Sequence, residues 1–238
     1  MLTPSRTYEQ GCTARVLTGG HEVGGSNPLS PTGPLPVSHT LGQVTSEEKA
    51  RWDERYSTGD YQPRWEPSPL VERAITLVRS GRALVLACGA GRNALRLAEA
   101  GFEVTGVDVS SVAIEMAKEA ASGRGLDIDW RVSDVRDLEM SDDTYDLITM
   151  IRFVDRNIWP DIPGALTENG WLLMEQHLRT YRDVVGPSGD YRLGPGELLE
   201  AFRRMRIVHY SEALEPSDRS SGMTATARLL ACKGDPGW

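Results

Sequence analysis

Residues 84–93 read LVLACGAGRN, in which an apolar run is followed directly by a glycine-rich turn and the start of a helical pattern. We expect a strand over 83–87 and a helix over 92–100 that ends at Gly101. At a strand-to-helix turn of this kind, glycines let a ligand approach the backbone, and the amino end of the helix favours negative charge. The stretch therefore predicts a ligand site in an α/β fold.

An acidic residue follows this turn at the spacing that a nucleoside-binding site needs. Asp108 ends the next expected strand, 103–107, and follows Gly91 by 17 residues. A carboxylate placed there accepts hydrogen bonds from both hydroxyls of a ribose, so the two features together predict a nucleoside-containing ligand. The alternative is a plain tight turn, with Asp108 capping the following helix. The spacing Gly89-x-Gly91-x-x-Ala94 also fits the dinucleotide fingerprint, so the loop alone leaves the cofactor open.

Helices and strands are expected to alternate along the rest of the chain. Apolar residues recur at helical spacing over 70–78, 112–120 and 198–205, and a proline-interrupted helical segment is expected over 157–167. We expect further strands over 128–132, 145–150, 171–176, 206–213 and 225–232, with a turn at 169–170. This order predicts a doubly wound, seven-stranded and mostly parallel Rossmann-like sheet. The short connection before the last strand makes that strand antiparallel.

The first 45 residues differ in composition from the rest. They contain 23 Gly, Pro, Ser or Thr residues and four charged ones, without a helical or alternating apolar pattern. Such a segment buries too little apolar surface to offset its loss of conformational entropy. We therefore expect a disordered extension over 1–45 and a single domain over 46–238.

Composition and charge exclude several functions. The 26 basic and 34 acidic side chains leave a formal net charge of −8, which opposes general binding to nucleic acid or anionic lipid. Cys12, Cys88 and Cys232 lie far apart without a C-x-x-C pair, so we expect reduced thiols and no metal site. No apolar run approaches the ~18 residues of a membrane span, and no secretory signal is recognised. We expect a cytoplasmic protein.

Successive motifs resemble those of class I S-adenosylmethionine-dependent methyltransferases. They are the loop 84–93, Val107-Asp108, Ser133-Asp134-Val135, the strand from Tyr145 and the segment 168–173. The reversed last strand is shared with that fold and not with dinucleotide-binding domains. The closest resemblance is to the small-molecule branch of tellurite-resistance (TehB-like) and thiopurine-type methyltransferases. It is carried by Trp52-Asp-Glu-Arg-Tyr56, Tyr61, Trp65, the CGAGRN loop, Gly194-Pro-Gly-Glu-Leu-Leu199 and His209-Tyr210.

The resemblance implies S-adenosylmethionine as the cofactor. Gly89 and Gly91 would border its methionine part, Asp108 would bind the ribose, and Asp134 would meet the adenine. The full set of expected cofactor contacts is Ala87, Cys88, Gly89, Gly91, Asn93, Asp108, Val109, Asp134, Val135 and Ile151. Two positions depart from the family pattern, because Val85 replaces a usual acid and Ala87 a frequent glycine. The departure at Val85 weakens the network around the cofactor's amino group.

Methyl transfer from a sulfonium is an in-line displacement, which alignment and partial desolvation accelerate. A soft nucleophile such as a thiolate or a reduced metalloid needs no strong base, whereas oxygen and nitrogen acceptors often do. Arg152 and His177 are the catalytic candidates, because they follow the ends of two neighbouring strands. With Arg156, Arg179 and Arg182 they form a local basic bias, which favours an anionic acceptor. The alternative is that these residues are charged only because they lie in solvent-exposed loops.

Aromatic residues ahead of the glycine loop suggest a lid. Trp52 and Tyr56 share one helix face, and Trp65 follows, so we expect residues 46–68 to cover the cofactor. The sequence thus favours methyl transfer to a small molecule, such as a thiol, a metalloid oxyanion or another anion. An NAD(P)-dependent oxidoreductase and a cofactor-binding protein without turnover are the alternatives. The chain lacks the Asp/Asn-Pro-Pro-aromatic motif of DNA amino-methyltransferases after residue 150, which opposes base methylation.

Overall fold

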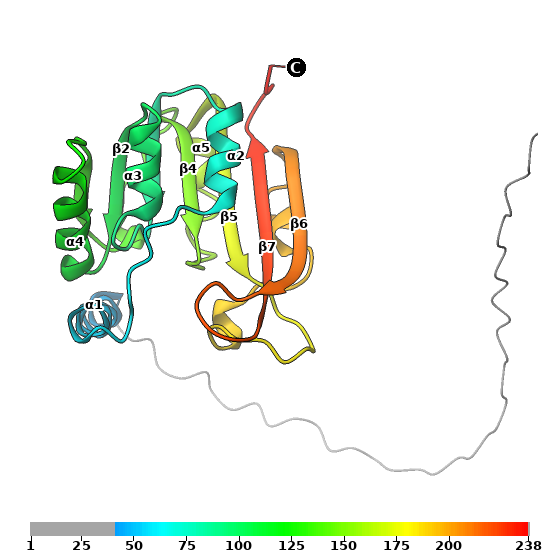
Figure 1. The fold of residues 1–238 in the computed structure, drawn as a ribbon. Helices are drawn as coiled ribbons and strands as arrows, with labels where there is room; N and C mark the ends of the chain where they lie inside the picture. Colours follow the sequence, from blue (N-terminus) through cyan, green and yellow to red (C-terminus); the bar gives the residue numbers. More distant parts are fainter. Residues whose placement is uncertain (1–40, 238) are drawn as a thin grey trace, which may run out of the picture. The chain divides into compact units, whose positions relative to one another are not determined.

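A seven-stranded sheet forms the centre of the structure (Figure 1). The computed structural model describes residues 41–237, all within one compact unit of the chain. The strands are β1 (Arg82–Leu86), β2 (Glu103–Asp108), β3 (Asp129–Val132), β4 (Tyr145–Ile151), β5 (Leu166–His177), β6 (Arg206–Pro216) and β7 (Met223–Cys232). Their order across the sheet is β3-β2-β1-β4-β5-β7-β6. Strand β7 runs antiparallel to both neighbours, so the prediction of a mostly parallel sheet with a reversed last strand is confirmed.

Helices cover both faces of this sheet. Helices α2 (Pro69–Leu77), α3 (Arg92–Glu99) and α4 (Ser111–Ser122) lie on the near face in Figure 1, and the short helices α5 (Ile162–Ala165) and α6 (Glu197–Ala201) contact β5 and β7. Two apolar clusters fill these layers. On β4, Leu147 belongs to one cluster and Ile148 to the other. This strand is therefore buried on both faces, as its apolar sequence predicts.

The segment before β5 differs from the prediction. A helical segment was expected over 157–167, but α5 has four residues and β5 begins at Leu166 instead of Trp171. Prolines 160 and 163 lack the amide hydrogens that a longer helix needs. The expected turn at 169–170 is a bulge, since Tyr145 pairs with Leu166 and Leu147 with Trp171.

Helix α1 (Leu41–Thr58) contacts α4 near the carboxyl ends of the parallel strands (Figure 1). The expected disordered extension 1–45 lies outside the described residues over 1–40, and residues 41–45 belong to α1. None of the described helices is both long and apolar enough to cross a membrane.

Asp53 anchors α1 to the amino end of α4. Its Oδ1 accepts hydrogen bonds from the hydroxyl of Ser110 (2.7 Å) and the amide of Val112 (3.2 Å), and Lys49 pairs with Oδ2. Burial raises the pKa of Asp53, but the hydrogen bonds from Lys49, Ser110 and Val112 outweigh it and lower that pKa to about 2. A carboxylate at a helix amino terminus satisfies unpaired amides and interacts favourably with the helix dipole.

We expect Asp53→Ala to lower the free energy of unfolding by about 1 kcal/mol at neutral pH, since it removes a helix-capping carboxylate. The folded-state pKa of about 2 lies below the ordinary value of 3.8. The contribution is therefore present above pH 3.8 and is lost as the pH falls towards 2. Urea unfolding at several pH values measures it, with the exposed Glu54→Ala as the control. Equal losses in both variants, or a loss that persists unchanged at pH 2, would contradict this assignment.

Candidate functional site

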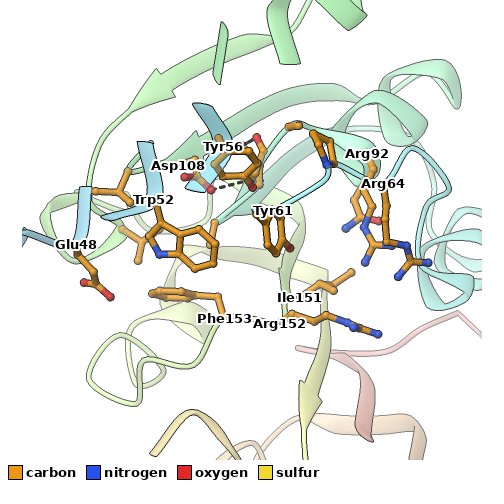
Figure 2. Close-up of a pocket in the computed structure, with 18 of the residues that line it drawn as sticks. Glu48, Trp52, Tyr56, Tyr61, Arg64, Arg92, Asp108, Ile151, Arg152 and Phe153 are labelled. Atoms are coloured by element: carbon orange, nitrogen blue, oxygen red, sulfur yellow. Dashed lines mark hydrogen bonds between the residues drawn. The ribbon is translucent and has the colours of Figure 1, made fainter. Parts of the chain in front are cut away.

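A cavity lies at the carboxyl edge of the sheet (Figure 2). Its floor is formed by the loops that follow β1, β2 and β4 and by the turn after β3. Helix α1 and the segment 61–64 cover it, and Arg219 in the loop between β6 and β7 completes the lining. In open α/β sheets, ligands bind outside the carboxyl ends of the strands where neighbouring connections diverge. The cavity occupies that position.

Two glycines shape the loop after β1 in different ways. Gly89 lines the cavity with φ +56°, and a Cβ there would lie 2.8 Å from the hydroxyl of Tyr56. Gly91 has φ +89° but is not among the lining residues. A Cβ on Gly91 would lie 2.7 Å from the ring of Trp130 and 3.0 Å from Cβ of Ala117. The lack of a side chain at Gly89 thus leaves room for the Tyr56 hydroxyl beside the cavity. The lack of one at Gly91 leaves room for Trp130 and Ala117 beneath the loop.

Asp108 is the buried carboxylate of the cavity floor, with 8% of its surface exposed. Its Oδ2 accepts a hydrogen bond from the amide of Gly89 (2.7 Å), and Oδ1 accepts one from the amide of Ser110 (2.9 Å). Burial raises its pKa, and these two amides oppose the rise. Each carboxylate oxygen has a second acceptor site, so the group retains capacity for two hydroxyl donors. Val109 beside it also lines the cavity.

Asp134 is held in an ion pair at the turn after β3. Its Oδ1 accepts from Nε of Arg136 (2.9 Å), and Oδ2 accepts from Nη2 (2.5 Å). The same Nη2 donates to Glu48 on α1 at 2.7 Å. Arg136 therefore links the turn after β3 to the cover of the cavity. Val135, between the paired residues, lines the cavity as expected.

The end of β4 places Arg152 in an unusual backbone conformation. Its φ is +59°, which for a non-glycine residue costs on the order of 1–3 kcal/mol. The amide of Arg152 donates to the carbonyl of Glu175 (2.7 Å), and its guanidinium contacts the Glu175 carboxylate (3.4 Å) and Asp218 (2.8 Å). Ile151 lies beside it in the lining. Strain of this kind persists where neighbouring contacts fix the side chain, as they do here.

The departures from the family pattern have visible consequences. Val85 is a core residue, 2% exposed, and pairs with Thr149 of β4. The hydroxyl of Thr149 is buried without a hydrogen-bond partner in the described part of the chain. Ala87 lines the cavity with φ +49°, a conformation that glycine adopts without strain. Both positions therefore lower the stability of the fold slightly, the first through a buried hydroxyl without a partner in the strand and the second through backbone strain in the turn.

Aromatic residues close the cavity from the side of α1. Ring centroids lie 5.4 Å apart for Trp52 and Tyr61 and 5.2 Å apart for Tyr56 and Tyr61. The guanidinium carbon of Arg219 lies 4.1 Å from the centroid of Tyr61. Phe153 faces this group from the loop after β4 (Figure 2). The expected cover over residues 46–68 thus has structural counterparts in Trp52 and Tyr56.

Besides Gly91, three expected site residues lie outside the cavity lining. Arg156 pairs with Glu197 (2.5 Å), and Trp65 is 42% exposed. His177 lies 3.3 Å from the hydroxyl of Thr224. Burial and the nearby Arg152 and Arg192 lower the pKa of His177 to about 4, so the ring is neutral near pH 7. Arg179 and Arg182 also lie outside the lining, beside Glu197 and Tyr181 respectively.

The remaining expected cofactor residues line the cavity, and several residues not foreseen line it too. Asn93 and Cys88 are present in the lining, although the side-chain oxygen of Asn93 also accepts from the amide of Ser68 (3.0 Å). Arg92 directly follows the glycine loop and Arg136 follows the Asp134 motif, so proximity in sequence was a usable signal. The residues missed are Glu48, Tyr61, Pro63, Arg64, Ala90, Arg92, Arg136, Phe153 and Arg219.

The family model described as a methyltransferase domain matches residues 83–173, from β1 into β5. These residues resemble a methyltransferase domain. YqeM from Bacillus subtilis (strain 168), named as a methyltransferase, is 34% identical over 101 residues, which are 42% of this chain and 38% of that protein. A ubiquinone biosynthesis O-methyltransferase from Coxiella burnetii (strain Dugway 5J108-111) is 33% identical over 85 residues, 36% of each chain. The chain spans well under half the length of these curated relatives.

Several solved structures have a similar fold. TehB from Haemophilus influenzae has a TM-score of 0.62 at 22% identity, over 76% of this chain and 66% of its own. A 1,6-didemethyltoxoflavin-N1-methyltransferase from Burkholderia thailandensis, solved with 1,6-didemethyltoxoflavin and S-adenosylhomocysteine, has a TM-score of 0.61 at 15% identity. That likeness covers 85% of this chain and 93% of the other. The methyltransferase fold predicted from the motifs is confirmed.

Gly91 and Gly125 allow the packing beneath the loop to be tested. Both have positive φ, but a Cβ on Gly125 meets nothing within 4 Å. We expect Gly125→Ala to cost about 1 kcal/mol of backbone strain, and Gly91→Ala to cost about 1–3 kcal/mol more because of the contact with Trp130. Urea denaturation of the two variants measures the difference. Equal destabilisation would show that Trp130 does not constrain this glycine.

Proposed function

We propose that the protein is an S-adenosylmethionine-dependent methyltransferase that acts on a small molecule. The observation that carries the proposal is the buried Asp108 at the end of β2, facing the cavity beside Gly89. A carboxylate with free acceptor capacity at the carboxyl edge of a doubly wound sheet suits the hydroxyls of a ribose. The methyltransferase domain and the reversed β7 support this cofactor over a dinucleotide.

The residues of the lining fit the parts of this cofactor. Asp108 would hold the ribose, and Gly89 would border the methionine part. Asp134 and Val135 would meet the adenine, with Arg136 keeping the Asp134 carboxylate in place. Ile151 would lie by the sulfonium.

S-adenosylmethionine supplies, when bound, a methyl group on a positively charged sulfur. The chain's part is to align the acceptor with that group and to exclude water, for which Trp52, Tyr56 and Tyr61 are placed. The described lining contains no histidine. The site therefore favours acceptors that are already good nucleophiles, such as thiolates and reduced metalloid species, or anions that the arginines of the lining hold.

A cofactor-binding protein without turnover is the second candidate. Val85 stands at the usual position of an acid, and the hydroxyl of Thr149, its partner in register on β4, is buried without a hydrogen-bond partner among the described residues. Incubation with S-adenosylmethionine and a panel of thiols, selenite and tellurite, followed by mass spectrometry, separates the two. Methylated products favour the enzyme. Cofactor binding without product from any acceptor favours the second candidate.

Calorimetric titration with S-adenosylmethionine, S-adenosylhomocysteine and NAD tests the proposed cofactor. We expect the first two to bind and NAD not to bind. Asp108→Asn should weaken S-adenosylhomocysteine binding at least about tenfold, because it removes a charged acceptor. The exposed Asp127→Asn should have no effect. Binding of NAD alone, or of none of the three, would contradict the proposal.

We expect the aromatic cover to contribute to cofactor affinity. The double variant Trp52→Ala, Tyr61→Ala keeps α1 but removes two rings of the lining, so it should weaken S-adenosylhomocysteine binding about tenfold. Deletion of residues 1–40 should leave the affinity unchanged, and deletion of residues 1–66 should abolish it. Circular dichroism checks that the variants remain folded. Retained affinity in the longer deletion would contradict a lid role.

A further inference from the structure

The cavity is acidic at one end and basic at the other. Figure 2 shows Glu48 and Asp108 on one side and Arg64, Arg92 and Arg152 on the other. The acidic side is the one proposed above to hold the adenosine. The basic side therefore lies beyond the adenosine, next to the methionine part of the cofactor and the place of the methyl acceptor.

The basic end has more guanidinium groups than carboxylates to pair with them. Arg92 donates to the carbonyl of Glu66 (3.0 Å), and Arg219 donates to the hydroxyl of Tyr61 and the carbonyl of Gln62. Neither has an acidic partner within 4.0 Å among residues 41–237. Arg92 is partly buried and Arg219 is exposed, and both line the cavity without a directly paired carboxylate, which favours an anionic ligand.

The other two arginines share one carboxylate that comes from a loop. Nη1 of Arg152 donates to Oδ1 of Asp218 (3.0 Å) and Nη2 to Oδ2 (2.8 Å), while Arg64 also donates to Oδ2. Asp218 lies between β6 and β7 and is itself not part of the lining. A paired fork of this kind is the geometry in which arginine recognises carboxylates. The structure thus displays a carboxylate seated against the basic end.

We propose that Arg64, Arg92, Arg152 and Arg219 form a subsite for the carboxylate of the methyl acceptor, and that Asp218 occupies this subsite until the acceptor displaces it. The proposal rests on the proposed function for the identity of the ligand as methyl acceptor. The acceptor class is a small carboxylate-bearing molecule, because the seated group is planar and held by a two-point fork. The aromatic residues Trp52, Tyr61 and Phe153 offer an apolar wall for the rest of such a molecule.

Displacement of Asp218 has a defined consequence for affinity. An attached carboxylate competes with a free one at a high effective concentration, so its presence weakens binding of the acceptor. Removing the charge of Asp218 should therefore strengthen binding of the acceptor. Removing a cation of the subsite should weaken binding of the acceptor.

Calorimetry with benzoate and with its neutral analogue benzamide tests the subsite, on the full chain saturated with S-adenosylhomocysteine. We expect wild type to bind benzoate more tightly than benzamide. Asp218→Asn should tighten benzoate binding about tenfold, and Arg64→Gln should weaken it about tenfold, as expected for one charged hydrogen bond. Benzamide binding should not change in either variant. The exposed loop residues Asp183→Asn and Arg182→Gln are matched controls expected to behave as wild type.

Unchanged or weaker benzoate binding in Asp218→Asn would overturn the proposal, as would equal binding of benzoate and benzamide. If Asp218→Asn melts below the assay temperature, Arg64→Gln and Arg92→Gln are used for the test instead. Wild-type affinity for benzoate in both of these variants would overturn the proposal. The titrations are repeated without S-adenosylhomocysteine. Failure of S-adenosylhomocysteine to bind while the benzoate pattern holds would contradict the proposed function and leave the carboxylate subsite standing.

Discussion

The buried carboxylate of Asp108 is the constraint on which the cavity depends. Because it lies under the floor of the cavity, its charge must be satisfied within the protein, and the amides of Gly89 and Ser110 do so. These two bonds fix the loop after β1 and the start of α4. Helix α4 then receives the Asp53 carboxylate of α1 at its amino end. One buried charge thus orders both the floor of the cavity and the helix that covers it.

The two ends of the cavity differ in charge, so they suit different parts of the ligands. Acidic groups lie where hydrogen-bond donors of a nucleoside would bind, and arginines lie at the opposite end, where Asp218 supplies a carboxylate from a loop. Under the proposed function, a site of this kind would separate the recognition of cofactor and acceptor, and its described lining contains no histidine. The positive φ of Arg152 belongs to the same arrangement, because its contacts with Glu175 and Asp218 hold the side chain at the basic end.

Local sequence predicted the fold and the floor of the site, because both depend on short motifs. The strand periodicity, the glycine turn and Asp108 placed the parallel strands and the cofactor side of the cavity. Sequence predicted Arg152 of the basic end but neither Arg64 nor Arg219, since these two meet only through the packing of the β6–β7 loop against the segment before α2. The expected helix over 157–167 was wrong because prolines shorten it. His177 and Arg156 follow the correct strands, but burial and the ion pair with Glu197 hold them outside the lining.

A crystal structure of the protein with S-adenosylhomocysteine tests the central claim most directly, namely that the acidic end of the cavity holds the adenosine and leaves the basic end to the acceptor. We predict the ribose hydroxyls on the carboxylate of Asp108, the adenine beside Asp134 and Val135, and the sulfur towards Ile151. The reverse orientation, with the adenosine against Arg64 and Arg152, would contradict the account. So would binding of the ligand outside the cavity.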